Sequence, residues 1–372
     1  MARLDEICSI NMGQSPDSAS YNETGEGLPF FQGNADFGEI HPSVRIWCSK
    51  PTKIANYGDI LISVRAPIGA LNIANTQCCI GRGLASLTVN TDVCDRAYLW
   101  HAISSKIEEL NSKGTGSTFK AISKSVLAET EMPLPSIEEQ CKIASILDKT
   151  NHLISLRKKQ LQKLDDLVKA RFVEMFGEPH RSKTYPYTKV SELTDVVSGG
   201  TPDRKNEEYW NDGTIPWVKT TELQNNVITE VEEHITEKGL SESSAKIVPA
   251  NTVLIAMYGQ GKTRGMTGFL GIEACTNQAC ACLLPTSNID MQYLWHFLIL
   301  SYDELRGLAQ GGNQPNLNAG MIKDFPILVP PMEKQKQLVS FVSQVNKFKL
   351  SIQQGLEKLE TLKQSLMQQY FG

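Results

Sequence analysis

One segment of the chain has the residue types and spacing of a relaxed phosphate-binding loop. It is Ala-Met-Tyr-Gly-Gln-Gly-Lys-Thr over residues 256–263, after a strand-like apolar run. Such a loop holds phosphate when it opens a helix, because the unpaired N–H groups at the helix start bind the anion. Residues 264–269 are instead rich in glycine and poor in helix formers. The pattern therefore disfavours a nucleotide site, and a nucleotide-binding enzyme built on Gly261-Lys262-Thr263 is the first alternative to carry forward.

The sequence holds no other arrangement typical of catalysis. Its six histidines lack metal-ligand spacing, and its nine cysteines form no Cys-x-x-Cys pair. A methyltransferase of the amino type would need Asn or Asp before Pro-Pro-aromatic, and Val329-Pro330-Pro331-Met332 has neither. We therefore expect no catalytic residue, no metal site and no cofactor on this chain. The cysteines should be reduced, buried or inert thiols in a cytoplasm.

The most informative pattern is an internal repeat with an offset of 195 residues. Tyr98-Leu99-Trp100-His101 returns as Tyr293-Leu294-Trp295-His296. The same offset joins several further identical pairs: Gly116 and Gly311, Pro135 and Pro330, Glu138 and Glu333, Gln140 and Gln335, Phe176 and Phe371. A fixed period of this size indicates a duplicated structural unit. Two copies in one chain suit a two-fold target, of which duplex DNA is the commonest.

Each copy ends in a long helical pattern. Ser136 and Glu139 form a capping box at the first helix start, and Gly177 and Pro179 end that helix. Apolar residues recur at 4-3 spacing, as in a coiled-coil seam. They are Ile143, Leu147, Ile154, Leu161, Leu164 and Val168 in the first copy, and Leu338, Val342, Val345, Ile352, Leu356, Leu359 and Leu366 in the second. We expect the two helices to pair, although each could instead cover a separate core.

These patterns predict an α+β protein. Two globular parts, over 1–135 and 178–331, are each followed by a helix, over 136–177 and 332–372. Each globular part should hold a mixed, largely antiparallel sheet and short helices. A helix of 40 residues is about 60 Å long. If the helices pair antiparallel as a coiled coil, the globular parts lie at opposite ends, about 17 base pairs apart on DNA.

Composition places few further limits on function. The net charge is −4, whereas DNA-binding proteins are often basic. The two helical segments carry +5 and the remainder −9, so any contact with phosphates needs clustered basic side chains or partner subunits. No apolar run reaches the length of a membrane span, and no signal peptide is recognisable at Met1. A two-headed protein–protein scaffold is therefore the second alternative.

The order of the motifs, duplicated, resembles the specificity subunit of type I DNA restriction-modification systems. In copy one the resembling segments are Gly13-Gln14-Ser15-Pro16, the strand and turn over residues 58–69, and Cys79-Ile80-Gly81-Arg82-Gly83. In copy two they are Gly199-Gly200-Thr201-Pro202, Ile215-Pro216-Trp217 and residues 312–317. Both copies add the Pro-x-x-Glu-x-Gln helix starts and the Phe-Gly helix ends. The likeness covers essentially the whole chain.

This resemblance implies a function without catalysis in a bacterial or archaeal cytoplasm. Two target-recognition domains would each bind one half of a split, asymmetric site in double-stranded DNA, and a coiled-coil spacer would set the gap. Two methyltransferase subunits would dock on the chain and methylate adenine N6 from S-adenosylmethionine. A motor-nuclease subunit driven by ATP and Mg²⁺ would join for cleavage. No membrane partner is implied.

Polar side chains on loops are the candidates for DNA contact. Arginine can fork onto guanine O6 and N7, and asparagine or glutamine can pair with adenine N6 and N7. In copy one we single out Arg65 and Arg82. In copy two the candidates are Lys262, Arg264, Gln278, Asn313, Gln314 and Asn316. Gln278 lies in the segment equivalent to that of Arg82.

Overall fold

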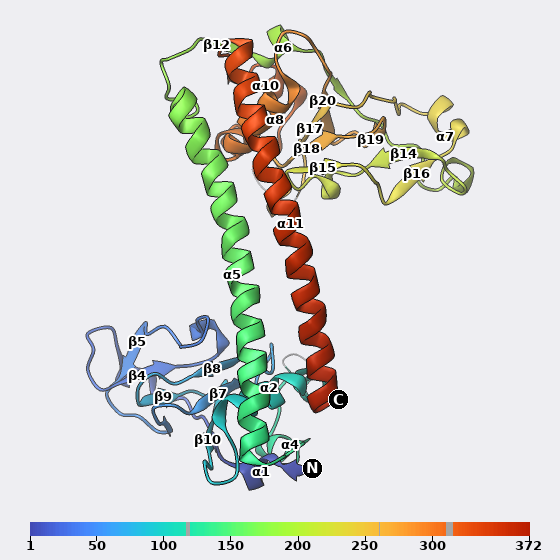
Figure 1. Cartoon of the computed structure of the whole chain (residues 1–372). Coiled ribbons are helices and arrows are strands. Elements are labelled where there is room, and N and C mark those ends of the chain that lie inside the picture. The colour runs from blue at the N-terminus through green and yellow to red at the C-terminus, as the bar shows by residue number, and fades with distance from the viewer. Residues whose placement is uncertain (117–119, 260, 310–314) are drawn as a thin grey trace. The chain divides into compact units, whose positions relative to one another are not determined.

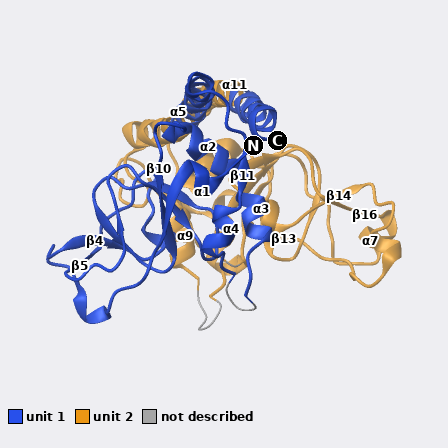
Figure 2. Ribbon diagram, turned by 90° about the horizontal axis from the view of Figure 1, so that it is seen from below, with its two compact units in different colours: residues 1–159, 353–372 blue, residues 160–352 orange. Residues whose placement is uncertain are grey.

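The computed structural model describes residues 1–116, 120–259, 261–309 and 315–372. The chain divides into two compact units, coloured separately in Figure 2. Unit 1 comprises residues 1–159 and 353–372, and unit 2 comprises residues 160–352. Each unit therefore contains one globular part and a portion of both long helices.

Unit 1 is built from short strands and short helices that precede the first long helix. Its strands are β1 (Ala2–Arg3), β2 (Cys8–Met12), β3 (Tyr21–Asn22), β4 (Leu28–Phe31), β5 (Ile46–Cys48), β6 (Ile54–Ala55), β7 (Ile60–Ser63), β8 (Leu71–Ile73), β9 (Cys78–Ile80), β10 (Leu84–Val89) and β11 (Glu131–Met132). Its helices are α1 (Leu4–Ile7), α2 (Arg96–Ser105), α3 (Ile107–Ser112) and α4 (Lys124–Ala128), with 3₁₀ turns at Ser18–Ser20 and Asn34–Asp36.

Two sheets share the core of unit 1. The order β2-β10-β7-β8 is antiparallel throughout, and the order β3-β5-β4-β9-β6 contains one parallel pair, β4 with β9. Ile60 and Ile62 of β7 pack with Tyr98 and Leu99 of α2 on one face of the sheet. Leu61 packs into a second cluster on the other face. Because both faces are covered, β7 is apolar at consecutive positions instead of alternating.

Unit 2 repeats this order of elements. Its strands are β12 (Tyr187–Lys189), β13 (Val196–Ser198), β14 (Ile215–Val218), β15 (Asn226–Ile228), β16 (Glu233–Ile235), β17 (Val253–Ala256), β18 (Thr267–Leu270), β19 (Cys275–Thr276), β20 (Cys280–Leu283) and β21 (Pro326–Leu328). Its helices are α6 (Val190–Leu193), α7 (Glu237–Ser241), α8 (Met291–Leu300), α9 (Tyr302–Gly307) and α10 (Ala319–Lys323), with 3₁₀ turns at Glu207–Tyr209 and Thr220–Glu222.

The sheets of unit 2 match those of unit 1 in their central strands. The order β13-β20-β17-β18 corresponds to β2-β10-β7-β8, with β15 added in parallel at the edge. The parallel pair β14 with β19 corresponds to β4 with β9. Val253 and Ile255 of β17 face one core cluster, and Leu254 and Ala256 face another. The predicted mixed α+β class, with largely antiparallel sheets, is confirmed.

The two long helices are α5 (Ile137–Phe176) and α11 (Met332–Phe371). The Ser136 hydroxyl accepts from the N–H of Glu139 at 3.4 Å, which caps α5. Gly177 ends α5 with a φ of 82°, a left-handed conformation that favours glycine. Within unit 1 the first part of α5 lies beside the last part of α11 (Figure 1), and Lys158 pairs with Glu360 at 3.0 Å.

A buried glutamine joins each long helix to its globular part in the same way. Gln140 and Gln335 are almost fully buried. The Oε1 of Gln140 accepts from the N–H of Asp95 at 2.8 Å, and that of Gln335 accepts from the N–H of Asp290 at 2.8 Å. Each Nε2 also donates to the carbonyl of the proline five residues earlier, at 2.8 Å. The identical bonds fix the start of both long helices.

The far ends of the long helices are anchored by aromatic rings. Phe371, at the end of α11, packs on Tyr98 with ring centroids 5.3 Å apart in unit 1. Phe176, at the end of α5, packs on Tyr293 at 5.5 Å in unit 2. Each tyrosine hydroxyl donates to the carbonyl 35 residues later, at 2.8 and 2.9 Å. The helix that begins in one copy therefore ends against the short helix of the other copy.

Candidate nucleic-acid interface

The eight sequence candidates for DNA contact differ in accessibility. The side chains of Arg65, Arg82, Lys262 and Gln278 are exposed, and those of Arg264 and Asn316 are half-buried. Asn313 and Gln314 lie outside the described residues. The exposed candidates occupy two loops in each unit, so the geometry of those loops decides what they can contact.

In unit 1, the turn over residues 81–83 connects β9 to β10 and carries Arg82. Five of its backbone hydrogen bonds have counterparts in unit 2: Gly81 N–H to Phe31 O at 2.8 Å, Leu84 N–H to Gly81 O at 3.0 Å, Val64 N–H to Gly83 O at 2.9 Å, Gln14 N–H to Ile80 O at 3.0 Å, and Gly13 N–H to Leu84 O at 2.9 Å. A sixth joins Gly83 N–H to Gln32 O at 3.2 Å. A Cβ on Gly83 would lie 2.5 Å from the Gln32 carbonyl oxygen, so glycine permits this close approach.

In unit 2, the turn over residues 277–279 connects β19 to β20 and carries Gln278. Five backbone hydrogen bonds repeat those of unit 1: Asn277 N–H to Val218 O at 3.0 Å, Cys280 N–H to Asn277 O at 3.1 Å, Met257 N–H to Ala279 O at 2.8 Å, Gly200 N–H to Thr276 O at 2.9 Å, and Gly199 N–H to Cys280 O at 3.4 Å. Arg82 and Gln278 therefore occupy the same position in the same local framework.

Both turns also touch the segment that runs beside them near the start of each copy. The Ser15 hydroxyl accepts from the N–H of Arg82 at 3.2 Å. The Thr201 hydroxyl donates to Oε1 of Gln278. Sequence reasoning did not single out Ser15 or Thr201 as functional residues, although both stand in the Gly-x-[Ser/Thr]-Pro segments that copy one and copy two share.

A second loop in each unit adjoins the turn. In unit 1 it follows β7 and carries Arg65, and the N–H of Gly69 closes it on the Ser63 carbonyl at 2.9 Å. In unit 2 it follows β17 and carries Lys262, and the N–H of Gly265 closes it on the Ala256 carbonyl at 2.9 Å. The loop of unit 2 is longer, so Arg65 and Lys262 are similar in charge but not in placement.

The structure of the loop after β17 in unit 2 bears on two predictions: the phosphate-binding loop and the DNA contact of Arg264. The N–H groups of its tip do not open a helix, because β18 follows it, and a phosphate-binding loop is therefore absent from the described residues here. The Arg264 guanidinium donates to the Pro315 carbonyl, and the Arg264 carbonyl accepts from Arg306 at 3.0 Å. Arg264 thus directs its side chain into the protein, while the Lys262 side chain is exposed.

Aromatic residues support each turn from the neighbouring sheet. In unit 1, Tyr21 stacks on Phe30 with ring centroids 4.7 Å apart. In unit 2, the guanidinium of Arg204 lies 3.8 Å from the Trp210 ring and 4.6 Å from the Trp217 ring. Sequence reasoning missed these groups. The Ile215-Pro216-Trp217 segment was the available signal, and its partner in copy one, Leu28–Phe31, differs in almost every residue.

The predicted seam residues of the long helices are all buried or half-buried. Ile143, Leu147, Leu338, Val342, Val345 and Leu356 are buried, and Ile154, Leu161, Leu164, Val168, Ile352, Leu359 and Leu366 are half-buried. In unit 1, Ile143 and Leu147 share a cluster with Phe371. In unit 2, Leu338 and Val342 share a cluster with Phe172. The helices therefore pack against each other and against the globular part of each unit.

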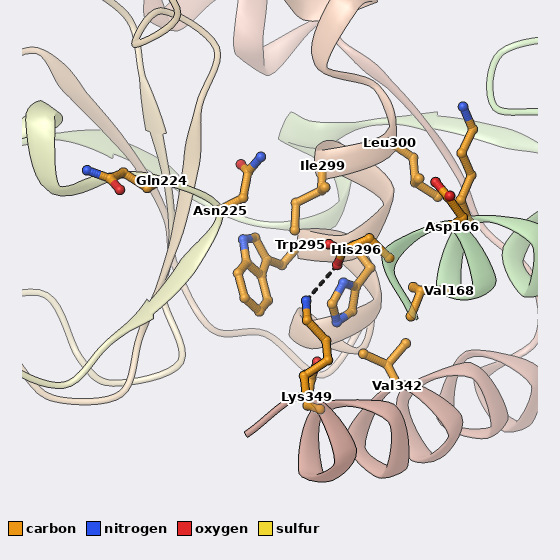
Figure 3. Close-up of a pocket in the computed structure, with 13 residues that line it drawn as sticks. Asp166, Val168, Gln224, Asn225, Trp295, His296, Ile299, Leu300, Val342 and Lys349 are labelled. Carbon is orange, nitrogen blue, oxygen red and sulfur yellow. Dashed lines mark hydrogen bonds and ion pairs between the residues drawn. The ribbon is translucent and has the colours of Figure 1, made fainter. Parts of the chain in front are cut away.

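A pocket of about 450 Å³ lies in unit 2 between α8 and the long helices. Figure 3 shows Trp295 and His296 of α8 facing it, with Lys349 of α11 beside them. Lys349 Nζ donates to Asp165 Oδ1 of α5 at 2.6 Å. Burial, with a smaller contribution from the Lys349 charge, lowers the pKa of His296 to about 4, so its ring is neutral at pH 7.

A pocket of about 620 Å³ occupies the equivalent place in unit 1. At the offset of 195 residues, Ile154 in this pocket corresponds to Lys349 in unit 2, and Glu360 corresponds to Asp165. The buried His101 of α2 bonds Asp148 at 2.8 Å, a carboxylate that His296 lacks because the equivalent residue is Ser343. The junction of short and long helices is therefore built twice, with different charges, and neither pocket assembles a nucleophile, base and oxyanion site.

A comparison with protein families identifies the architecture. The model of the type I restriction modification DNA specificity domain matches residues 1–166 and 183–364. The chain belongs to this family. The match covers both copies, so each of the two globular parts is a specificity domain with its long helix.

Several curated members of the specificity-domain family are similar in sequence. The putative MjaX specificity subunit of Methanocaldococcus jannaschii is 43% identical over 161 residues, which is 43% of this chain and 38% of that protein. The EcoR124I/EcoR124II specificity subunit of Escherichia coli is 27% identical over 248 residues, which is 64% of this chain and 59% of that protein. The MjaIX specificity subunit of M. jannaschii is 24% identical over 393 residues, covering 98% and 90%. The chain thus spans less than two thirds of the first two relatives.

Solved structures share the fold of this specificity-domain chain. The type I restriction-modification S subunit of M. genitalium superposes with a TM-score of 0.61 at 15% identity, over 100% of this chain and 95% of that one. A chain from a structural study of complex assembly and conformational transition of the type I system superposes with 0.62 at 17% identity, over 99% and 96%. At such identities the likeness concerns the fold.

Other chemistry has little support among the residues that the structure describes. They contain no group of three or more His, Cys, Asp or Glu placed to hold a metal ion. All nine thiols are free, and burial raises the pKa of Cys8, Cys78 and Cys94 to about 12, which keeps these three protonated and unreactive. In the described part of this specificity-domain chain, no helix is long and apolar enough to cross a membrane.

Proposed function

We propose that this chain is the DNA-specificity subunit of a type I restriction-modification complex. Each unit binds one half of a split, asymmetric site in double-stranded DNA, and the chain itself carries out no catalysis. The observation that carries the proposal is the match of the specificity family to both copies. The paired turns add support, because a shared framework presents Arg82 in one unit and Gln278 in the other.

The long helices act as the spacer between the two recognition domains. An antiparallel two-helix coiled coil would place the domains at its opposite ends and fix the gap between half-sites. Contacts within unit 1 support antiparallel packing: Ile143, early in α5, shares a cluster with Phe371 at the end of α11, and Lys158, farther along α5, bonds Glu360, which is earlier in α11. Each half-site binds weakly, and a stiff spacer raises the effective concentration of the second contact when the gap matches.

The partners are two methyltransferase subunits, which bring S-adenosylmethionine, and a motor-nuclease subunit, which brings ATP and Mg²⁺. Each long helix carries exposed apolar residues at equivalent positions. Leu153 and Phe348 are 46% and 66% exposed, and Leu167 and Leu362 are 47% exposed each. Leu153 and Leu362 belong to unit 1, and Leu167 and Phe348 belong to unit 2, so each unit has one of these exposed apolar residues on each long helix. Two equivalent surfaces suit two copies of one partner.

Substitutions on these surfaces test the stoichiometry of the complex. Leu153→Lys with Leu362→Lys should reduce the number of bound methyltransferase subunits from two to one, and Leu167→Lys with Phe348→Lys should do the same. Ser340→Lys, at an exposed polar position of α11, is the control and should retain two. Native mass spectrometry of the co-expressed complex measures the count. Two bound subunits in both double variants would place the docking surface elsewhere.

Single-molecule methylation sequencing tests the function itself. The host genome should carry a split adenine-methylation motif that disappears when the gene is deleted and returns when it is restored. We place the protein in the cytoplasm of a bacterium or archaeon, where it has access to that DNA. The net charge of −4 implies that the partner subunits supply many of the phosphate contacts. An unchanged methylome would contradict the proposal.

A further inference from the structure

We propose that position 82 of unit 1 and position 278 of unit 2 are equivalent base-reading positions, with Arg82 selecting a guanine and Gln278 selecting an adenine. This inference rests on the proposed function and deepens it, because it assigns a base identity to one position in each half-site. The asymmetry of the target then follows in part from one substitution within a duplicated framework.

The equivalence of the two positions comes from the backbone. Five hydrogen bonds, between 2.8 and 3.4 Å, join the same elements in the same order in both turns, and the turn of unit 1 has one more, from Gly83 N–H to Gln32 O at 3.2 Å. The turns therefore present their middle residue at the same place relative to the sheet. A difference in what the two units select at this place must come from the side chains, Arg82 and Gln278, because the backbones are held alike.

Arg82 has the geometry and the free donors that a guanine contact requires. Its backbone is fixed by the Ser15 hydroxyl at 3.2 Å and by the bonds of the adjacent glycines. Among the described residues its guanidinium makes no hydrogen bond or ion pair, and the side chain is exposed. A guanidinium that is free but mounted on a rigid turn loses little backbone entropy when it forks onto guanine O6 and N7.

Gln278 is oriented for adenine by a neighbouring hydroxyl. The Thr201 hydroxyl donates to Oε1 of Gln278, and the amide NH₂ has no hydrogen-bond partner among the residues that the structure describes. A carbonyl oxygen has two acceptor sites, so Oε1 can still accept from adenine N6 while the NH₂ donates to N7. Thr201 is thus a positioning residue, since it fixes which edge of the amide faces outward.

The rival explanation is that both residues contact phosphates. Lysine and arginine on loops commonly bind the DNA backbone, and such contacts contribute affinity that does not depend on sequence. The two roles predict different results. Loss of a phosphate contact lowers affinity for all sequences alike, whereas loss of a base contact removes the preference at one position of one half-site.

The test is selection of bound duplexes from a random DNA pool by the chain assembled with its methyltransferase subunits. The wild-type complex should enrich a split motif. Arg82→Gln should lose guanine at one position of one half by roughly 5- to 150-fold and leave the other half and the gap unchanged. Gln278→Arg should lose adenine at one position of the other half only. Arg3→Gln, an exposed arginine on β1, is the matched control and should keep the wild-type motif.

Thr201→Val provides the test of orientation. It should weaken the adenine preference of the same half that Gln278→Arg affects and leave the half affected by Arg82→Gln intact. An enriched motif that stays the same in both Arg82→Gln and Gln278→Arg would overturn the inference, as would a uniform loss of affinity over all sequences. Failure of the wild-type complex to enrich any split motif would overturn the proposed function and this inference with it.

Discussion

The two copies are alike where the globular parts meet the long helices and unlike where their loops face outward. Gln140 and Gln335 share two bonds at the same distances, and Tyr98 and Tyr293 donate to carbonyls the same number of residues away. The exposed turns over residues 81–83 and 277–279 share their backbone hydrogen bonds but carry different side chains, Arg82 and Gln278. Buried polar groups tolerate little change because an unpaired donor is costly, whereas an exposed side chain can vary freely. The shared buried residues therefore stabilise the fold, and the differing exposed residues are the candidates for recognition.

The largest expected effects on stability come from the phenylalanines that anchor the ends of the long helices, and the two should differ. Phe176→Ala should lower the free energy of unfolding by about 3–5 kcal/mol, as for a large aromatic side chain removed from a core. Phe371→Ala should cost less, because Phe371 contacts one aromatic ring among the described residues, whereas Phe176 contacts three. Chemical denaturation measures both. The exposed Phe348→Ala is the control, and a larger loss for Phe371→Ala would reverse the comparison.

The two glutamine anchors should be similar in strength, with Gln140 contributing somewhat more to the free energy of unfolding than Gln335. Gln140→Ala or Gln335→Ala leaves a buried N–H and a buried carbonyl without partners, which costs about 2–3 kcal/mol. Two bonds are shared, but Gln140 Nε2 also donates to the Val93 carbonyl at 3.1 Å, so the loss for Gln140→Ala should be larger by up to about 1 kcal/mol. Urea denaturation compares them, with the exposed Gln344→Ala as control. A larger loss for Gln335→Ala than for Gln140→Ala would contradict this order.

The two histidines should differ in their response to acid. Burial lowers the pKa of His296 to about 4, below the value near 6.5 of an unfolded chain, so its stabilisation is complete above pH 6.5 and lost as the pH falls toward 4. Burial also lowers the pKa of His101, but Asp148 opposes that shift.

Unfolding at pH 7 and pH 4.5 measures this difference. The wild-type chain should lose free energy of unfolding between pH 7 and pH 4.5, because protonating the partly buried His296 ring is costly. His296→Gln should make that loss smaller by about 2 kcal/mol. His101→Gln should remove less. Equal pH dependence in the wild-type chain and the His296→Gln variant would contradict the assignment.

The smallest expected effect on stability comes from replacing Lys349, a charged residue in the apolar seam of α11. Lys349 in unit 2 stands where Ile154 stands in unit 1, and its ion pair with Asp165 is partly exposed. Lys349→Ile should therefore change the free energy of unfolding by less than about 1 kcal/mol. A loss above about 2 kcal/mol in thermal or chemical denaturation would show that the pair is needed to align the helices.

The long helices were the part of the fold most accessible from sequence. Forty residues with apolar positions at 4-3 spacing, a serine cap and a terminal glycine leave few other structures possible, and the same pattern appears twice. The equivalence of the two turns was also predictable, since Arg82 and Gln278 stand in matching segments of similar sequence.

Other features could not be found from the sequence. The strand residues Phe31 and Val218 hold equivalent positions at an offset of 187 instead of 195, because the intervening loops differ in length. The inward bond of Arg264 to Pro315 depends on a contact between residues 51 positions apart. The Thr201–Gln278 bond likewise joins distant loops. Local patterns do not encode such contacts, and so the division of candidates into exposed and internal groups required the structure.

The spacer is tested most directly by the gap of the methylated motif in a shortened variant. Deleting residues 157–163 and 352–358 removes one heptad from each long helix, and the two deletions correspond at the offset of 195. Methylation sequencing of a host that carries this variant should show the same two half-sites with a gap about 3 base pairs shorter, since seven residues of helix span about 10 Å. A methylated motif with the original gap would contradict the account.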